Sequence, residues 1–170
     1  MGSSSPTPGS SQGAFWVATS DDVVLTRVVG LGTMNNSVPF QQLSEHLIGR
    51  GYRKFIFDLG ECRGFDSTFL GILLGLAQAG RRVVLVNGNA SHRALLEEVG
   101  MDQIVSLHEG RVGIPNLPME KLEQRAVGSQ ERIRMVLTAH ENLVRLDSRN
   151  EAKFGEFLAR IRAELGEETT

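Results

Sequence analysis

The sequence has few of the features that mark several common classes of protein. Its single cysteine, Cys62, excludes an intrachain disulfide and a metal cage built from several cysteines. No apolar run approaches the ~18 residues that a membrane-spanning helix needs. The formal net charge of −2 gives no sign of nucleic-acid binding, and the N-terminus lacks the basic and apolar regions of a signal peptide. These absences predict a cytoplasmic protein without a membrane span.

Motifs for cofactors are also missing. Neither G-x-G-x-x-G nor G-x-x-x-x-G-K-[ST] occurs at a strand-to-helix turn, so nucleotide chemistry of the usual kind is not predicted. The histidines show no spacing that is typical of a metal site, such as i, i+4 on one helix face. They are His46, His92, His108 and His140. We expect all four at surface or boundary positions, with no metal and no cofactor.

What the chain does contain is a regular alternation of β-rich and helix-periodic segments. Residues 1–13 are rich in Ser, Gly and Pro and are predicted to be disordered. The expected strands are 14–20, 23–30, 52–60, 81–88 and 104–107, and the expected helices are 39–51, 67–80 and 89–101. This order predicts an α/β fold over residues 14–109, with a mixed, mostly parallel sheet flanked by helices. The first two strands form a hairpin that adds an antiparallel edge.

The first expected helix has a simple start signal. Ser37 is the expected N-cap, and Pro39 is tolerated in the first turn. The strand over residues 52–60 lacks clean alternation, as is typical of a central strand that is covered on both faces. The helix over 67–80 is apolar nearly all round and should be heavily buried.

Residues 110–118 are predicted to be a linker, and residues 119–170 a C-terminal helical extension. Helical spacing continues to the end of the chain, and Ser148 with Glu151 matches a capping box, so two helices are expected rather than one long helix. The second helix carries an apolar stripe: Phe154, Phe157, Leu158, Ile161 and Leu165. This stripe either packs on the domain or drives oligomerisation, for instance as a homodimer, and the sequence leaves both possibilities open.

Two chemistries are conceivable at the junction "GECRGFDSTFLG", residues 60–71. Cys62 stands in the G-x-C-x-G spacing of a nucleophile elbow. An elbow needs the helix to begin directly after the nucleophile, whereas this helix is expected to begin near Ser67. Nothing in the sequence ties a base to the cysteine. We therefore interpret residues 60–64 as a loop with a small buried cysteine, and we do not predict an enzyme.

Asp66, Ser67 and Thr68 offer a second chemistry. Either Asp66 or Ser67 can cap the helix, an interaction worth ~1 kcal/mol. A phosphorylated hydroxyl at this place would carry about −1.5 to −2 charges, which the free amides and the dipole of a helix N-terminus tolerate. A partner docked over the same point would not tolerate that charge. The residues thus suit a switch that changes an interface and leaves the fold intact.

The stretch "DLGECRGFDSTFLGILLGL", residues 58–76, resembles the signature segment of STAS domains, the anti-sigma factor antagonist family. In that family a strand ending in "DLS" is followed by a short loop and by "DSSGLG" opening a helix. Asp58 and Leu59 match the strand end, the sequence from Asp66 to Thr68 matches the acidic residue and the hydroxyl pair, and Leu70-Gly71 match the closing pair. Residues 81–110 are also similar to the family. The resemblance covers residues 14–109.

The resemblance implies a non-enzymatic signalling adaptor that takes part in partner switching. Such a domain binds a GHKL-type serine kinase or anti-sigma factor, which phosphorylates it, and a PP2C-like phosphatase reverses the modification. By position, Ser67 is the implied phosphorylation site and Thr68 the alternative. The implied partner-binding residues are Asp66, Phe65, Phe69, Asn36 and Ser37. No nucleic acid is expected among the partners.

The sequence departs from the family at two places. Phe69 replaces the usual glycine after the hydroxyl pair and is expected to reshape the docking surface. The segment "LGTMNNSVPF", residues 31–40, is unlike the family's usual loop before the first helix. The alternative function is a constitutive STAS scaffold or oligomerisation module in a signalling or transport complex, which acts through the C-terminal helices.

Overall fold

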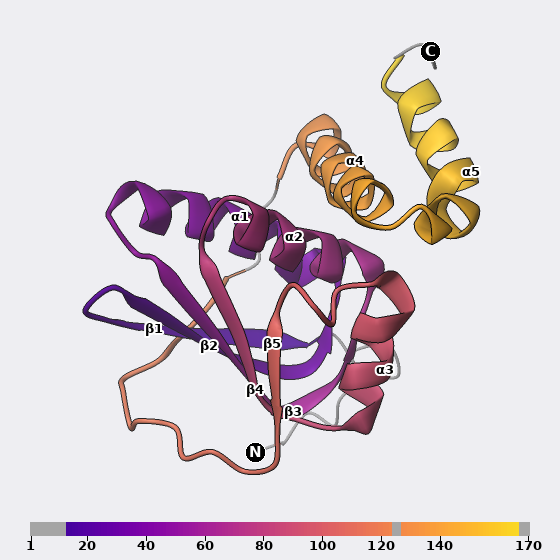
Figure 1. The fold of residues 1–170 in the computed structure, drawn as a ribbon. Helices are drawn as coiled ribbons and strands as arrows, with labels where there is room; N and C mark the ends of the chain where they lie inside the picture. The colour runs from indigo at the N-terminus through magenta and orange to yellow at the C-terminus, as the bar shows by residue number, and fades with distance from the viewer. Residues whose placement is uncertain (1–12, 124–126, 167–170) are drawn as a thin grey trace, which may run out of the picture.

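The computed structural model describes residues 13–123 and 127–166, and its described part forms a six-stranded sheet with helices packed on it (Figure 1). Residues 1–12, nearly all of the segment for which disorder is predicted, lie outside the described residues. The strands are β1 (Ala14–Ser20), β2 (Val23–Gly32), β3 (Lys54–Phe65), β4 (Arg82–Gly88), β5 (Ser106–Glu109) and β6 (Glu120–Lys121). The helices are α1 (Met34–Gly49), α2 (Ser67–Gln78), α3 (Ala90–Val99), α4 (Ser129–Leu146) and α5 (Arg149–Glu164).

The sheet has the mixed topology that the sequence predicts. Its strand order is β5-β4-β3-β2-β1-β6, in which β2, β3, β4 and β5 are parallel and β1 pairs antiparallel with β2. Each parallel connection passes through a helix, as right-handed crossovers require. The α/β fold with a mostly parallel sheet and a C-terminal helical extension is confirmed.

Aromatic side chains fill the space between the sheet and the helices. The fully buried rings are Phe15, Phe40, Phe55, Phe57 and Phe69. They meet edge to face, with ring centroids 5.4 Å apart for Phe40 and Phe57 and 5.5 Å apart for Phe15 and Phe69. Figure 1 shows α1 and α2 side by side over the sheet. The apolar residues of α1, α2 and α3 join those of the strands in one continuous core.

The expected N-cap of the first helix is wrong. The helix begins at Met34, so Ser37 lies inside it and its hydroxyl donates to the Thr33 carbonyl at 2.6 Å. The residue in the N-cap position, Thr33, makes no side-chain cap. The Met34 amide instead donates to the carboxylate of Asp66, 3.0 Å away. The cap comes from a distant part of the chain, which local sequence signals do not reveal.

The expected loop over residues 60–64 is also wrong, because β3 runs without a break to Phe65. Its last residues pair with the end of β2, with register shifts between Arg27 and Val29 and between Gly30 and Leu31. Gly60 and Gly64 have no side chains that could pack on a helix, and two glycines within five residues predict a loop. In the structure they lie in an irregular part of a ladder, a place where glycine is common.

The C-terminal part returns to the sheet before it becomes helical. Residues 111–119 have no regular structure, and β6 then pairs antiparallel with β1 at the edge of the sheet. The helices α4 and α5 form a hairpin that lies over α2, which confirms two helices rather than one (Figure 1). The expected capping box is wrong: Ser148 makes no side-chain cap, and Asp147 accepts from the Arg149 amide at 3.0 Å. The domain boundaries stay a prediction.

Within the described ranges, the structure contains no helix long and apolar enough to cross a membrane.

Candidate functional site

The centre of the candidate site is Asp66, the N-cap of α2. Its Oδ1 accepts from the Phe69 amide at 2.9 Å, and its Oδ2 accepts from the Met34 amide at 3.0 Å. The predicted capping role of Asp66 is confirmed, and one carboxylate serves the first turns of two helices. The junction between β3 and α2 is therefore fixed to the start of α1, and Ser67 has a defined position at the first turn of α2.

The Ser67 hydroxyl meets a histidine from the C-terminal extension. Its Oγ lies 2.7 Å from Nε2 of His140, while Nδ1 of His140 lies 2.8 Å from the Val136 carbonyl in the same helix. A carbonyl can only accept, so Nδ1 carries the proton and donates to Val136. Nε2 is then an acceptor, and the Ser67 hydroxyl donates to it. Ser67 itself is half-buried.

His140 is enclosed almost completely. Its side chain is 2% exposed, and the rings of Phe154 and Phe157 lie at 5.1 Å and 4.8 Å from its own. Burial lowers its pKa below the ordinary 6.5, against the raising effects of the Val136 hydrogen bond and the charge of Asp66. The imidazole is therefore neutral at pH 7, and a neutral imidazole is the form that accepts from a serine.

The expectation of surface or boundary histidines is wrong for His92 as well as for His140. His92 is 1% exposed and completes a capping box with Asn89 at the start of α3. Its Nδ1 accepts from the Asn89 amide at 3.1 Å, and its Nε2 lies 2.9 Å from the Cys62 carbonyl, to which it donates. The Asn89-x-x-His92 spacing after a strand was the signal that could have revealed this cap.

The expected partner-binding side chains, apart from Asp66, lie in the interior. Phe65 is 7% exposed, and Phe69, Asn36 and Ser37 are less exposed still. Phe69 points into the core against Phe15 and Phe57, so it does not reshape an outer surface as expected. Thr68 is 4% exposed. In this conformation these residues are buried beneath the surface at Asp66 and Ser67. Their part in partner binding stays a prediction.

Cys62 lacks the surroundings of a nucleophile. Burial raises the pKa of its thiol to about 11, against weaker lowering by hydrogen bonds with backbone groups of Gly64 and Gly32. The Sγ donates to the Gly64 carbonyl at 3.4 Å. The nearby His92 is bonded to the Cys62 carbonyl and not to the thiol. A thiol with so high a pKa is almost entirely protonated at pH 7, and the thiolate is the reactive form.

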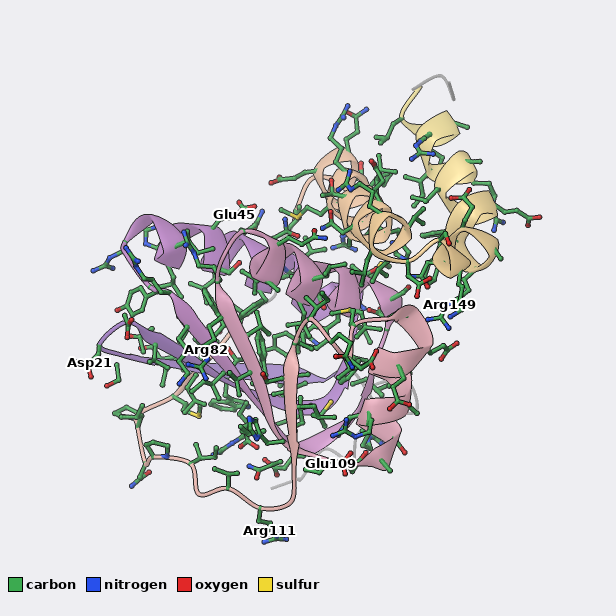
Figure 2. All side chains as sticks on the ribbon, in the orientation of Figure 1. Asp21, Glu45, Arg82, Glu109, Arg111 and Arg149 are labelled. Atoms are coloured by element: carbon green, nitrogen blue, oxygen red, sulfur yellow. The ribbon has the colours of Figure 1, made fainter. Side chains whose placement is uncertain are left out.

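The hairpin of α4 and α5 is held over α2 by a very close helix crossing. A Cβ added at Gly71 would lie 2.2 Å from the Ala139 carbonyl oxygen, so only glycine fits there. Asn142 of α4 donates to the Gly71 carbonyl at 3.4 Å, and Gln42 of α1 reaches Glu131 at 3.1 Å. Figure 2 shows side chains in the region between α2 and α4.

The hairpin also rests on the C-terminal end of α3. Asn150 donates to the Val99 carbonyl at 3.0 Å and to the Leu143 carbonyl at 2.8 Å, and it is fully buried. Lys153 donates to the Glu98 carbonyl. Figure 2 shows Arg149 at the start of α5, close to this end of α3. The extension thus touches three helices of the domain, α1, α2 and α3, and covers the Ser67 end of α2.

Comparisons with known proteins give matches at the level of fold only. No family model matches the sequence, and no curated protein matches it either. Among solved structures, a putative anti-sigma factor antagonist from Thermotoga maritima is 22% identical with a TM-score of 0.49, covering 56% of this chain and 86% of that chain.

The anti-sigma factor antagonist SpoIIAA is also similar. Its unphosphorylated form is 17% identical with a TM-score of 0.47, covering 58% of this chain and 90% of that chain. The phosphorylated form of the Bacillus protein is 18% identical with a TM-score of 0.46, covering 55% and 90%. These proteins bear the description of the family that residues 58–76 resemble.

Proposed function

We propose that the protein is a signalling adaptor of the anti-sigma factor antagonist type, whose binding to a partner protein is switched by reversible phosphorylation of Ser67. The observation that carries the proposal is the position of the Ser67 hydroxyl at the first residue of α2, directly after the Asp66 cap. Ser67 is half-buried, whereas Thr68 is 4% exposed. The difference in exposure favours Ser67 over Thr68 as the modified residue.

The local electrostatics suit a phosphate that leaves the fold intact. The first amides of a helix have no partner within the helix, and they attract anions. Asp66 already accepts from the Phe69 amide. A phosphate on Ser67 would therefore use the helix amides that precede Phe69, and it would lie close to the negative charge of Asp66. The added charge of about −1.5 to −2 would thus remain partly uncompensated on the surface. A partner that docks on the unmodified surface would be repelled.

The protein itself would supply the acceptor hydroxyl and the docking surface, and others would supply the chemistry. A GHKL-type serine kinase or anti-sigma factor would bind the adaptor and transfer the γ-phosphoryl group of ATP to the Ser67 oxygen, releasing ADP and the hydroxyl proton. A PP2C-like phosphatase would hydrolyse the phosphoester. Cys62 plays no part, because its raised pKa keeps the thiol protonated.

The alternative, a constitutive scaffold that oligomerises through its C-terminal helices, has less support from the packing. The stripe on α5 is largely used within the chain: Leu158 and Ile161 are buried against Val136 and Leu137 of α4. Phe154 packs against the main core, and Phe157 is 37% exposed. Little of the stripe is left for a second copy.

The test is phosphopeptide mapping of the protein purified from its native host, with and without phosphatase treatment. The variants are Ser67→Ala and, as a matched control, Ser148→Ala, which removes an exposed hydroxyl next to a different helix start. We expect one phosphate on Ser67, absent from Ser67→Ala and retained in Ser148→Ala. Phosphate only at other positions, or none under any growth condition, would contradict the switch.

A further inference from the structure

The Ser67 end of α2 is covered by another part of the same chain. Helix α4 crosses α2 at Gly71, one turn beyond Ser67, with Ala139 as the residue at the crossing. Backbones approach this closely only where both helices carry small residues. A second glycine of α2, Gly75, leaves room for Asn142, whose amide nitrogen would lie 3.2 Å from an added Cβ. This face of α2 is shaped to receive a helix.

The occupant does not fill that face completely. A cleft of ≈ 310 Å³ remains where α1, α2 and α4 meet. Its lining includes apolar side chains from the domain, among them Ile48, Ile72 and Leu76. Ile72 and Leu76 are already buried, whereas Ile48 is only half-buried. A helix with larger apolar residues beside the crossing point would cover Ile48 as well. The face therefore fits helices other than the one that occupies it.

The α4–α5 hairpin has the packing of a unit that can separate from α2 as a whole. Its own small core, formed by Val136, Leu137, Leu158 and Ile161, is separate from the core of the domain. Ala139 and Leu143 of α4 join the domain core, and Leu146 of α4 and Phe154 of α5 pack against it. Separation of the hairpin from α2 would expose those residues and leave the small core of the hairpin intact.

The contact between Ser67 and His140 links this interface to the proposed switch. The 2.7 Å between Oγ and Nε2 accommodates a hydrogen and no larger group. When Oγ carries a phosphoryl group in place of its proton, Ser67 can no longer donate to His140. The imidazole nitrogen would then be a buried acceptor without a donor, which is costly. Phosphorylation and the closed position of the hairpin oppose each other in this geometry.

We propose that the α4–α5 hairpin is an exchangeable intrachain ligand, which occupies a helix-docking face on α2 and competes there with an amphipathic helix of the partner protein. The partner helix would carry a small residue against Gly71 and apolar residues along the cleft. The competition rests on the proposed function, whereas the docking face and the release of the hairpin do not.

The first part of the test opens the hairpin in the full-length chain. Ala139→Glu places a long charged side chain at the closest point of the crossing and leaves the α2 face unchanged. Ala159→Glu is the matched control, because Ala159 is an exposed residue of α5. We expect amide hydrogen exchange in α4 and α5 to increase at least tenfold in Ala139→Glu and to stay as in the parent chain in Ala159→Glu, with β3 and β4 protected in both.

The second part supplies the occupant from outside. The probe is a synthetic peptide of residues 129–165, added to each full-length variant and followed by titration calorimetry. We expect binding to Ala139→Glu at least tenfold tighter than to the parent chain or to Ala159→Glu, whose faces are occupied. Adding Gly71→Ala to Ala139→Glu should abolish binding, since the new Cβ blocks the crossing. Gly49→Ala, a helical glycine with nothing within 4 Å, is the control for that change.

The outcomes separate the inference from the proposed function, because neither part needs a kinase or a phosphate. Continued protection of α4 and α5 in Ala139→Glu would overturn the proposal. So would the loss of protection in β3 and β4, which would make the hairpin an integral part of the fold. If the hairpin opens but the α2 face binds no peptide, the proposed docking face is wrong. Failure to find phosphate on Ser67 would overturn only the switch.

Discussion

The sheet domain and the C-terminal hairpin are held together in different ways. The domain is built around fully buried phenylalanines that link strands and helices from distant parts of the chain. The hairpin has a small aliphatic core of its own. It meets the domain through one close crossing, through apolar side chains such as Leu143 and Phe154, and through hydrogen bonds at His140, Asn142 and Asn150.

Because of this difference, the loss of a contact should have different consequences in the two regions. A hole in the phenylalanine core weakens every element that packs on it, so the whole domain should respond. A hole between α4 and α2 weakens a contact that joins two parts, each with its own core. The first kind of change should alter global stability, and the second should alter the fraction of molecules in which the hairpin is closed.

The largest expected effect is that of Phe57→Ala, at the centre of the domain. Phe57 is fully buried between Phe40 and Phe69, and truncation of such a ring costs about 3–5 kcal/mol. We expect a fall of this size in the free energy of unfolding, measured by denaturant titration with the fluorescence of Trp16 in β1. Phe157→Ala, on a half-exposed ring of the hairpin, is the control and should change it by less than about 1 kcal/mol. Equal effects would erase the distinction between the regions.

Leu143→Ala should have the next largest effect, but on the hairpin alone. Leu143 is fully buried and is the main aliphatic side chain that α4 contributes to the domain core. Its truncation should cost about 2–5 kcal/mol of docking free energy. Hydrogen exchange should show α4 and α5 opening while β3 and β4 stay protected. Opening of the whole molecule in a single step would show that the two regions are one cooperative unit.

Ser67→Ala tests the same interface with a smaller change. It removes the hydroxyl that donates to Nε2 of His140 and should cost about 1–3 kcal/mol of docking free energy. Exchange in α4 should rise, and the unfolding midpoint reported by Trp16 should move little. Ser148→Ala, which removes an exposed hydroxyl, is the comparison. Unchanged exchange in Ser67→Ala would mean that water replaces the hydroxyl and that the contact contributes little.

The sequence predicted the domain far better than the contacts of the hairpin. Strand and helix periodicity with a local cap at Asp66 determined the order of elements and placed Ser67 at a helix start. The start of α1 was missed because its amide is capped by Asp66 from another part of the chain. The end of β3 was missed because two glycines in residues 60–64 suggested a loop, whereas pairing with β2 keeps that segment extended.

The site itself could be predicted only in part. A hydroxyl after a capping aspartate is a local pattern, and it was found. The partner of that hydroxyl, His140, is 73 residues away and reaches it through helix packing that depends on Gly71. In the sequence, Gly71 was one of a matched closing pair, and His140 was one polar residue on an apolar helix face. Nothing in the spacing of either residue indicated that they belong to one interface.

The smallest expected effect is the loss of stability in acid. It compares the two regions, because each region holds one buried histidine. The pKa of both His92 and His140 is lowered, in each case chiefly by burial. Each histidine therefore binds its proton more weakly when buried than when released. Its contribution is fully present above the ordinary pKa of 6.5 and is lost as the pH falls from there through the lowered pKa, with a slope of at most about 1.4 kcal/mol per pH unit.

The groups around the two histidines differ, and so should the responses. Protonation of His140 removes the acceptor for Ser67 and is opposed by burial against Phe154 and Phe157, with the Val136 hydrogen bond and the charge of Asp66 in its favour. Acid should therefore open the hairpin, seen as lower protection factors in α4 below pH 6.5, that is, faster exchange relative to the intrinsic rate at the same pH. Protonation of His92 breaks the α3 capping box and should lower global stability.

His140→Gln should remove the pH dependence of the α4 protection factors and keep that of global unfolding, and His92→Gln should do the reverse. If either variant removes both dependences, the two histidines report one cooperative structure, and the division between a rigid domain and a releasable hairpin fails. If each removes only its own, the hairpin responds to the Ser67–His140 contact independently of the domain on which it lies. That independence is what a competitor for the docking face on α2 requires.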